Sequence, residues 1–231
     1  VSFFGFCAEL FERYKDDQRI SLITGTNYDE VTPDMPCDYF FTTAFNINGW
    51  GTWRRVFRQW EEHYEFLDDP YAMRLLRNFI KKYRHQQNFI ESCQSHRSVN
   101  KAYYETLFHA AIFFQSGLSI VPRVNMVSNL GACGEGTHYS GSNATLPRAI
   151  RRIFEMGHHE LDLPLRHPRY VIEDVGYKDR FFRSQGWGHP WLKVGRSFEE
   201  LWLNLRHGNF RHILKAMAAR WRKLTGRALW D

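Results

Sequence analysis

The sequence predicts an α/β fold that ends in a helical tail. Residues 19–24 and 118–121 are short runs of β-branched and other apolar residues, which are typical of buried strands. Apolar residues at helical spacing lie before, between and after these runs, and this alternation is typical of α/β proteins. With 231 residues, of which 43% are hydrophobic and 16% aromatic, the chain can bury the core of one domain or somewhat more.

The first part of the chain predicts a helix, a strand, a loop and a second short strand. Apolar residues recur at the spacing of one helix face at Phe3, Phe6, Leu10 and Tyr14. The strand at residues 19–24 ends in a turn at Gly25, and the proline-containing residues 28–38 predict a loop. A short strand is expected at residues 39–41.

The middle of the chain predicts three helices. The first is marked by Trp53, Val56, Phe57 and Trp60. Asp69 and Pro70 form a start signal for the second, with Asp as the cap and Pro in the first turn. Its buried face is predicted to consist of Leu75, Leu76, Phe79, Ile80 and Tyr83. The third helix is expected at residues 103–114, ending before Gly117.

The last part of the chain predicts little regular structure before a helical tail. Residues 125–128 predict a short strand and residues 170–172 an edge strand, whereas the small polar residues at 131–143 predict a mobile loop. The tail has one apolar stripe, made of Phe210, Ile213, Leu214, Met217, Trp221 and Leu224. We therefore expect a domain at residues 1–175, a linker at 176–197 and a basic amphipathic helical tail at 198–231.

The net charge of +6 is concentrated in the tail. From Leu201 onward the chain has seven Lys and Arg residues and one acid, whereas the other 200 residues have 24 basic and 24 acidic side chains. This neutral body argues against nucleic acid as a partner, because nucleic-acid binding requires basic residues spread over a face. The tail, with Trp202, Trp221 and Trp230, predicts contact with an anionic membrane surface. The alternative is a helix docked on the domain with a solvated basic face.

Cysteine spacing and hydropathy favour a cytoplasmic protein. The cysteines at positions 7, 37, 93 and 133 form no CxxC pair, and we expect buried free thiols, as in a reducing compartment. No apolar run approaches the ~20 residues that span a bilayer, and no secretory signal pattern is present. The expected location is the cytoplasm, with the tail peripheral on the inner face of the cell membrane.

Three segments carry a resemblance to a known family. Residues 117–131 read GLSIVPRVNMVSNLG, residues 39–55 read YFFTTAFNINGWGTWRR, and residues 2–10 read SFFGFCAEL. They resemble the acceptor-side part of bacterial nucleotide-diphospho-sugar glycosyltransferases, a family also labelled hemolytic protein HlpA-like, and the resemblance extends to about Asp174. It implies the C-terminal portion of a GT-A-like mixed-sheet glycosyltransferase domain.

The resemblance implies that a nucleotide-binding half with an acidic metal site precedes Val1. The complete enzyme is then expected to use a divalent metal, Mn²⁺ or Mg²⁺, whose main ligands lie upstream of Val1. It is expected to transfer a sugar from a nucleotide sugar to a glycan or lipid-linked acceptor in cell-surface polysaccharide synthesis, by inversion in one displacement. The isolated chain is expected to have little activity.

The resemblance also assigns a base and a metal contact. Glu105 matches the acid of the family's WDYQW segment and is the candidate base for the acceptor hydroxyl, with Tyr104 beside it as a substrate contact. His138 is the candidate supplementary metal ligand, and Glu135 in the same loop is a candidate substrate contact. The alternatives are a glutamate favoured by the dipole at a helix N-terminus and an exposed loop histidine.

Two further groups are candidate substrate contacts. Gly49 and Gly51 allow close approach of a ligand to the backbone, and the indole of Trp50 between them could stack on a sugar; the alternative is a core tryptophan with glycines that end a strand. The second group lies at strand ends, where open α/β sheets bind ligands, and consists of Asn27, Asn125 and Asn129. The alternative is that these amides bond turn backbone.

A second function class remains open from the sequence. The aromatic content and the basic tail also suit a non-catalytic carbohydrate- or partner-binding module that attaches to a membrane surface. The two classes differ in the effect of replacing Glu105 by Gln, because a catalytic base loses its rate and keeps its binding, whereas a binding module has no rate to lose.

Overall fold

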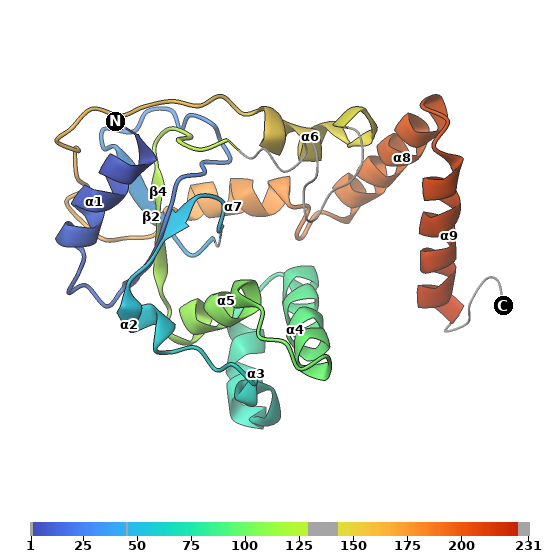
Figure 1. The fold of residues 1–231 in the computed structure, drawn as a ribbon, viewed down its shortest axis with the longest axis horizontal. Helices are drawn as coiled ribbons and strands as arrows, with labels where there is room; N and C mark the ends of the chain where they lie inside the picture. Colours follow the sequence, from blue (N-terminus) through green and yellow to red (C-terminus); the bar gives the residue numbers. More distant parts are fainter. Residues whose placement is uncertain (1, 45, 129–142, 226–231) are drawn as a thin grey trace. The chain divides into compact units, whose positions relative to one another are not determined.

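The computed structural model describes residues 2–44, 46–128 and 143–225. The chain forms two compact units, one made of Val1–Ser128 with Met156–Gly188 and the other of Asn129–Glu155 with His189–Asp231 (Figure 1). The first unit contains a four-stranded mixed sheet with helices, so the predicted α/β class is confirmed. In the described ranges, no helix is both long enough and apolar enough to cross a bilayer.

The sheet of the first unit consists of β1 (Ile20–Thr24), β2 (Tyr39–Thr42), β3 (Trp50–Gly51) and β4 (Leu118–Pro122), in the order β2-β4-β1-β3. β1 and β4 are parallel, whereas β2 pairs with β4, and β3 with β1, in antiparallel fashion. Strand residues of β1 and β2 are buried throughout, as expected for a sheet covered on both faces. The predicted strands at residues 19–24, 39–41 and 118–121 are therefore confirmed.

One face of the sheet is covered by α1 (Phe3–Arg13). The predicted apolar stripe is confirmed, because Phe6, Leu10 and Tyr14 are buried in one cluster with the sheet residues that point to this side. The Tyr14 hydroxyl shares a hydrogen bond of 2.7 Å with the hydroxyl of Tyr39. The first helix is thereby fixed to β2 by both apolar contact and a buried polar pair.

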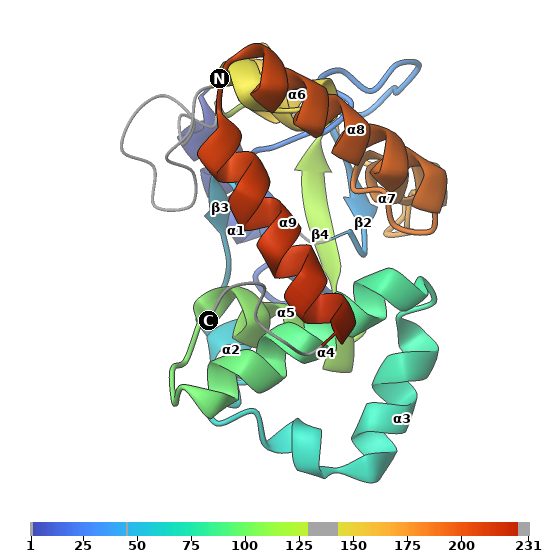
Figure 2. The same cartoon turned by 90° about the vertical axis from the view of Figure 1, so that its right-hand side faces the viewer.

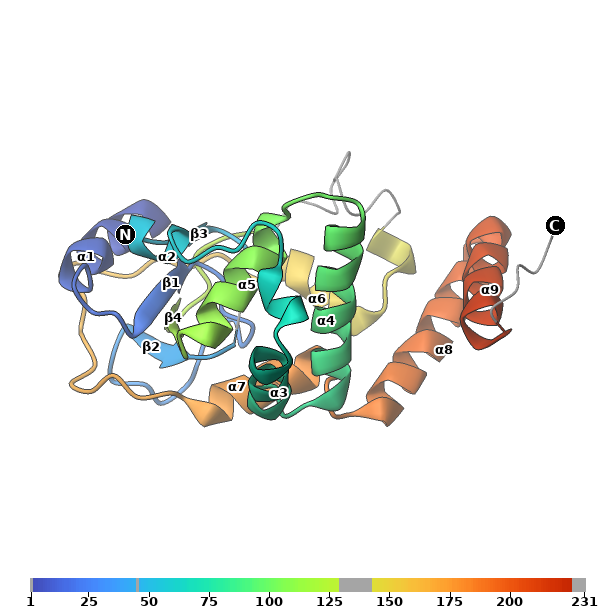
Figure 3. The ribbon, with the colours of Figure 1, turned by 90° about the horizontal axis from the view of Figure 1, so that it is seen from below.

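The opposite face is covered by α5 (Tyr104–Phe114) and α7 (Val175–Ser184), so this unit has helix, sheet and helix layers (Figure 3). Leu22 of β1 packs with Phe108 and Ile112 of α5. The contact of α7 with the sheet is a second buried cluster, made of Phe40, Ala44, Val121, Tyr177 and Phe181. The helix expected at residues 103–114 is confirmed, and it ends at Gln115 before Ser116 takes a positive φ of 51°.

The predicted linker at residues 176–197 is wrong, because it contains α7 and the start of another helix. Asp174 caps α7 by accepting a hydrogen bond of 2.7 Å from the backbone N–H of Tyr177. Only Tyr177 and Phe181 of this helix are buried, and they lie one turn apart among charged residues. Such a short apolar pair carries too little periodicity to predict a helix from sequence.

The remaining helices of the first unit pack around α5 beside the sheet (Figure 2). They are α2 (Arg54–Phe57), η1 (Glu65–Asp68), α3 (Pro70–Phe79) and α4 (Tyr83–Ser98). The start signal of α3 is confirmed, because the Asp69 carboxylate accepts hydrogen bonds from the backbone N–H groups of Tyr71 and Ala72 at 2.7 and 3.1 Å. The helix predicted around residues 53–60 is shorter, and it comprises α2 alone.

The predicted buried face of α3 is only partly correct. Leu76 and Ile80 are buried, together with Met73, whereas Leu75, Phe79 and Tyr83 are 46%, 41% and 65% exposed. The core formed with α4 and α5 covers a narrower stripe of α3 than the apolar pattern suggests. α4 itself was not predicted, because its buried residues His85, Phe89, Ile90 and Cys93 stand in a strongly polar sequence.

Two predicted strands are wrong. Residues 125–128 form no strand, and only Val124 beside them makes an isolated bridge, to Val31. Residues 170–172 are likewise irregular, and a single parallel bridge joins Glu173 to Phe41. At both places the pairing with a neighbouring segment is limited to a single bridge, so no strand forms.

The second unit is helical in its described part and consists of η2 (Asn143–Thr145), α6 (Arg148–Glu155), α8 (Pro190–Arg206) and α9 (Phe210–Thr225). The described part of the predicted tail is helical and consists of the end of α8 and all of α9. The break lies at Gly208, whose φ of 67° is left-handed. Asn204 is 2% exposed, and its amide oxygen accepts a hydrogen bond of 2.9 Å from Asn209, which ties α8 to the start of α9.

The described cysteines are free thiols, as predicted, although they are not all buried. Cys7 and Cys93 are buried, and burial raises the pKa of each thiol to about 12, whereas Cys37 is half-buried. Cys133 lies outside the described residues. Thiols with such raised pKa values are mostly protonated and unreactive at neutral pH.

Candidate active site

The candidate base Glu105 lies in the first turn of α5, and three side chains fix the start of this helix. The hydroxyl of Thr106 lies 2.8 Å from the hydroxyl of Tyr64 and 2.9 Å from Nδ1 of His96. The hydroxyl of Tyr64 also accepts a hydrogen bond of 3.3 Å from the backbone N–H of Tyr103. Because His96 belongs to the last turn of α4, these hydrogen bonds join the C-terminal end of α4 to the N-terminal end of α5.

The carboxylate of Glu105 is half-buried, and one of its oxygens is not satisfied. Oε2 is buried and has no hydrogen-bond partner among the residues that the structure describes. A buried acceptor without a donor is costly, so a ligand hydroxyl at this position would gain a favourable contact. The negative charge of Glu105 adds to the effect of burial in raising the pKa of Tyr104, and it opposes the burial that lowers the pKa of His96.

A stacked pair of aromatic side chains lies next to Glu105. The ring of Trp50, from β3, lies 6.1 Å from the ring of Tyr104 at an interplanar angle of 17°, and 5.1 Å from the ring of Phe108. Trp50 is half-buried and Tyr104 is 45% exposed, so part of this aromatic surface faces solvent. Stacked or tilted aromatic rings of this kind form an apolar surface that suits the face of a sugar ring.

The glycines beside Trp50 are required by the protein's own packing. Gly49 has a φ of 55°, and a Cβ on it would lie 2.7 Å from Cγ1 of Val127. A Cβ on Gly51 would lie 2.5 Å from Cζ of Phe11. These contacts explain both glycines without a ligand, in line with the alternative interpretation from the sequence. They also fix the backbone of β3 and thereby the position of the Trp50 ring.

The amides of Asn27 and Asn125 are committed to the protein backbone. Both residues are fully buried. Nδ2 of Asn27 donates to the carbonyl oxygens of Pro122 and Arg123 at 2.9 and 2.8 Å, and its Oδ1 accepts from the backbone N–H of Asp29. Nδ2 of Asn125 donates to the carbonyl oxygens of Val127 and Gly157 at 2.9 and 2.8 Å, and its Oδ1 accepts from the N–H of Asn27.

These bonds match the alternative interpretation of Asn27 and Asn125, in which the amides hold turn backbone rather than substrate. They join the loop after β1 to the segment after β4, which lie side by side because those strands are parallel neighbours. The third asparagine, Asn129, lies outside the described residues, as do Glu135 and His138. Their predicted roles stay predictions.

The described residues do not fit a divalent metal site. Over residues 2–44, 46–128 and 143–225, no group of three or more His, Cys, Asp or Glu side chains is arranged to hold a metal ion. The divalent metal that the family resemblance implies stays a prediction.

Sequence reasoning missed other polar groups of this region. His96 and Thr106 are described above, and the indole Nε1 of Trp60 is buried without a hydrogen-bond partner in the described part of the chain. The Trp60 ring lies 5.8 Å from that of Phe108, which follows Glu105 by one turn of α5. A tryptophan in an apolar pattern looks like a core residue, so its free donor could not be inferred from the sequence.

Comparisons of this chain with protein-family models, with curated proteins and with solved structures find no match. The described geometry therefore carries the functional argument together with the motifs. Of the predicted site residues, Trp50 stacks on Tyr104, and Tyr104 precedes Glu105 in α5. Asn27 and Asn125 instead form hydrogen bonds with backbone groups of the protein.

Proposed function

We propose that this chain is the acceptor-binding part of a glycosyltransferase, with Glu105 as the general base. One observation carries the proposal: a half-buried carboxylate with an oxygen that lacks a donor in the described residues belongs to the residue that follows Tyr104, and Tyr104 stacks on Trp50. A carboxylate next to an aromatic surface supplies what an acceptor sugar needs, namely a stacking surface and an acceptor for the hydroxyl proton.

In this proposal the reaction is a single displacement with inversion. The hydroxyl of a glycan or lipid-linked acceptor donates to the carboxylate of Glu105 and transfers its proton there as its oxygen bonds to the anomeric carbon of the donor sugar. The bond from that carbon to the nucleoside diphosphate breaks, and the diphosphate leaves with the bonding electrons. Stabilising the leaving diphosphate requires cationic groups or a metal ion.

The aromatic pair gives the first test, in the full-length gene product. We expect Tyr104→Ala to raise the KM for the acceptor about tenfold and to leave kcat nearly unchanged, because it removes stacking but not the base. Trp50→Phe, which keeps an aromatic ring in the cluster, should raise KM less. Transfer of radiolabelled sugar, measured against acceptor concentration, reports both constants.

The matched control for Tyr104→Ala is Tyr71→Ala, since Tyr71 is 59% exposed on α3 and away from Glu105. An unchanged acceptor KM in both Tyr104→Ala and Trp50→Phe would contradict the assigned acceptor surface. If the full-length gene product binds glycans but transfers no sugar from any nucleotide sugar, the protein is a carbohydrate-binding module and the enzymatic proposal is wrong.

We further propose that α9 attaches the enzyme to an anionic membrane surface, on the inner face of the cell membrane, where lipid-linked acceptors would be reached. The supporting observation is a face with exposed apolar residues at helical spacing, Phe210, Leu214, Met217 and Trp221, which are 59%, 53%, 56% and 49% exposed. Arg211 and Lys215 on the same helix are exposed cations. An apolar face flanked by cations is typical of interfacial helices.

Membrane attachment is tested with the chain itself. We expect it to cosediment with vesicles that contain about one third anionic lipid at low salt, and binding should weaken strongly at about 0.5 M salt, where charges are screened over about 4 Å. Leu214→Glu with Met217→Glu should abolish the cosedimentation, whereas Leu192→Glu on α8 serves as a control. Equal binding to purely zwitterionic vesicles, or no binding at low salt, would contradict the proposal.

A further inference from the structure

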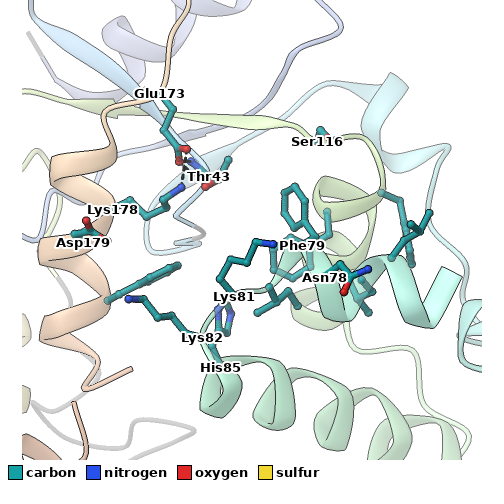
Figure 4. Close-up of a pocket in the computed structure, with 16 residues that line it drawn as sticks. Thr43, Asn78, Phe79, Lys81, Lys82, His85, Ser116, Glu173, Lys178 and Asp179 are labelled. Carbon is teal, nitrogen blue, oxygen red and sulfur yellow. Dashed lines mark hydrogen bonds and ion pairs between the residues drawn. The ribbon is translucent and has the colours of Figure 1, made fainter. Parts of the chain in front are cut away.

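A pocket lies in the first unit, at the end of α5 opposite to Glu105. Its volume is about 820 Å³, and it is bordered by the end of α3, the start of α4, the end of α5 and α7 (Figure 4). Pockets for organic ligands in proteins typically measure about 300–1,000 Å³. No local sequence pattern indicates this pocket, because its walls come from separate segments of the chain.

One wall of this pocket is apolar. Leu75 and Phe79 of α3 and Phe114 of α5 line it, and they are 46%, 41% and 39% exposed. The pocket therefore explains why part of the apolar stripe predicted for α3 is not in the core. Apolar side chains gathered around a concave surface can cover the body of an organic ligand.

His85 supplies an unsatisfied polar group in the same pocket. It is only 6% exposed, and neither Nδ1 nor Nε2 has a hydrogen-bond partner in the described ranges. Its ring stacks on Trp187 at a centroid distance of 4.0 Å and an angle of 6°, which fixes its orientation. Figure 4 shows the ring rising from the first turn of α4 toward Lys81 and Lys82. A neutral imidazole offers one donor and one acceptor, so it can bond a ligand oxygen.

The charged groups of the pocket leave two cations available. Lys178 is neutralised by Glu173 at 2.6 Å, and Glu173 also accepts the backbone N–H of Thr43 at 2.8 Å. Lys81 and Lys82 line the pocket, and neither makes an ion pair within the part of the chain that the structure describes. Asp179 is the remaining acid among the lining residues, and it is exposed. Two lysines and one unsatisfied imidazole among the residues that line the pocket favour an anionic group.

We propose that this pocket binds an amphipathic organic anion, with an apolar body against Leu75, Phe79 and Phe114 and a carboxylate or phosphate group between His85, Lys81 and Lys82. The anion accepts charge-assisted hydrogen bonds from the two ammonium groups and one from the imidazole N–H. The inference does not rest on the proposed glycosyltransferase activity, because Glu105 and its aromatic neighbours lie at the other end of α5.

The test uses the chain labelled with ¹⁵N and follows the ring nitrogens of His85 by NMR during titration. The probes are octyl phosphate, octanoate, 1-octanol and inorganic phosphate. We expect saturable shifts of the His85 resonances with one or both organic anions, and much weaker binding of the alcohol, which lacks the charge, and of inorganic phosphate, which lacks the apolar body. A lower Kd for octyl phosphate than for octanoate identifies a phosphate ligand, and the reverse identifies a carboxylate.

Substitutions separate this site from general surface binding. The double variant Lys81→Gln with Lys82→Gln should raise the Kd for the tighter anion at least about tenfold, as expected when charge-assisted hydrogen bonds are lost. Lys101→Gln, an exposed lysine outside this pocket, should leave the Kd unchanged. His85→Phe keeps an aromatic ring against Trp187 and should raise the Kd about fivefold, as monitored through the Trp187 indole N–H.

Two results would overturn the proposal. One is the absence of any shift of His85 at saturating concentrations of both organic anions. The other is binding of 1-octanol as tight as that of the anions with no change in the double lysine variant, which would show a pocket that selects apolar bodies without regard to charge.

Discussion

Replacing Glu105 by Gln should lower kcat for sugar transfer by about 10²–10⁴-fold, the usual contribution of a general base. The amide keeps the size of the side chain and can still contact an acceptor hydroxyl, but it cannot take up the proton. The KM for the acceptor should therefore change by less than about threefold. Steady-state transfer assays with the full-length gene product, at several acceptor concentrations, measure both constants.

The control for this substitution is Glu91→Gln, an exposed glutamate of α4 for which kcat should stay at the unsubstituted value. Thermal unfolding of both variants shows whether the fold is intact. If Glu105→Gln retains the full kcat, Glu105 is not the base, and the carboxylate is then the helix-terminal glutamate that the sequence left as the alternative.

The free energy of unfolding should fall by about 3 kcal/mol between pH 7 and pH 4 through His85 alone. Burial lowers the pKa of His85 from 6.5 to about 4, because the low-dielectric interior disfavours the charged imidazole. In the unfolded chain the same group binds a proton near pH 6.5. Below pH 6.5 the unfolded chain binds a proton at His85, whereas the folded chain does not. The contribution of His85 to the free energy of unfolding is therefore fully present above pH 6.5 and is lost as the pH falls to about 4.

His109 acts in the same direction, because burial and then the neighbouring His85 lower its pKa well below the usual value. The carboxylates of Asp38 and Glu173 have net lowered pKa values, since ion pairs and hydrogen bonds outweigh their burial. Their contributions are lost only as the pH falls below about 4, the usual pKa of a free carboxylate. The change in the free energy of unfolding between pH 6.5 and about 4.5 therefore reflects the protonation of the buried histidines in the unfolded chain.

Urea unfolding at pH 7.0, 5.5 and 4.5 measures this dependence. His85→Phe removes one titrating group and should flatten the curve by about one proton, and it should also stabilise the protein because a buried unsatisfied imidazole is replaced by an apolar ring. His63→Phe, at a residue whose side chain is exposed, is the matched control for the substitution. A stability that is constant from pH 7 to pH 4.5 would show that His85 is accessible to protons in the folded state.

The sequence was most informative where a local signal and the tertiary environment agree. The β-branched run of β1 and the start signal at Asp69 predicted their elements because a buried strand and a capped helix need only nearby residues to form. By contrast, α4 has a polar composition, and it is held by packing of Phe89 and Cys93 against α3 and α5, which no local pattern could reveal.

The candidate site shows the same division. Motifs in the sequence selected Glu105, Tyr104, Trp50 and the asparagines, but they could not tell a ligand contact from a structural bond. The tertiary structure stacks Trp50 on Tyr104 beside a carboxylate oxygen without a described donor, and it commits the amides of Asn27 and Asn125 to backbone. Whether one of these side chains contacts a ligand or the protein itself depends on which residues from distant parts of the sequence pack against it.

By itself, the sequence determined the α/β class, the helical tail and its positive charge, because periodicity and composition act locally. Only the tertiary structure decided which apolar residues of α3 enter the core and which line the pocket with His85, Lys81 and Lys82. The physical reason is that burial is a property of neighbours: the same apolar stripe becomes core or pocket wall according to the segments that pack against it.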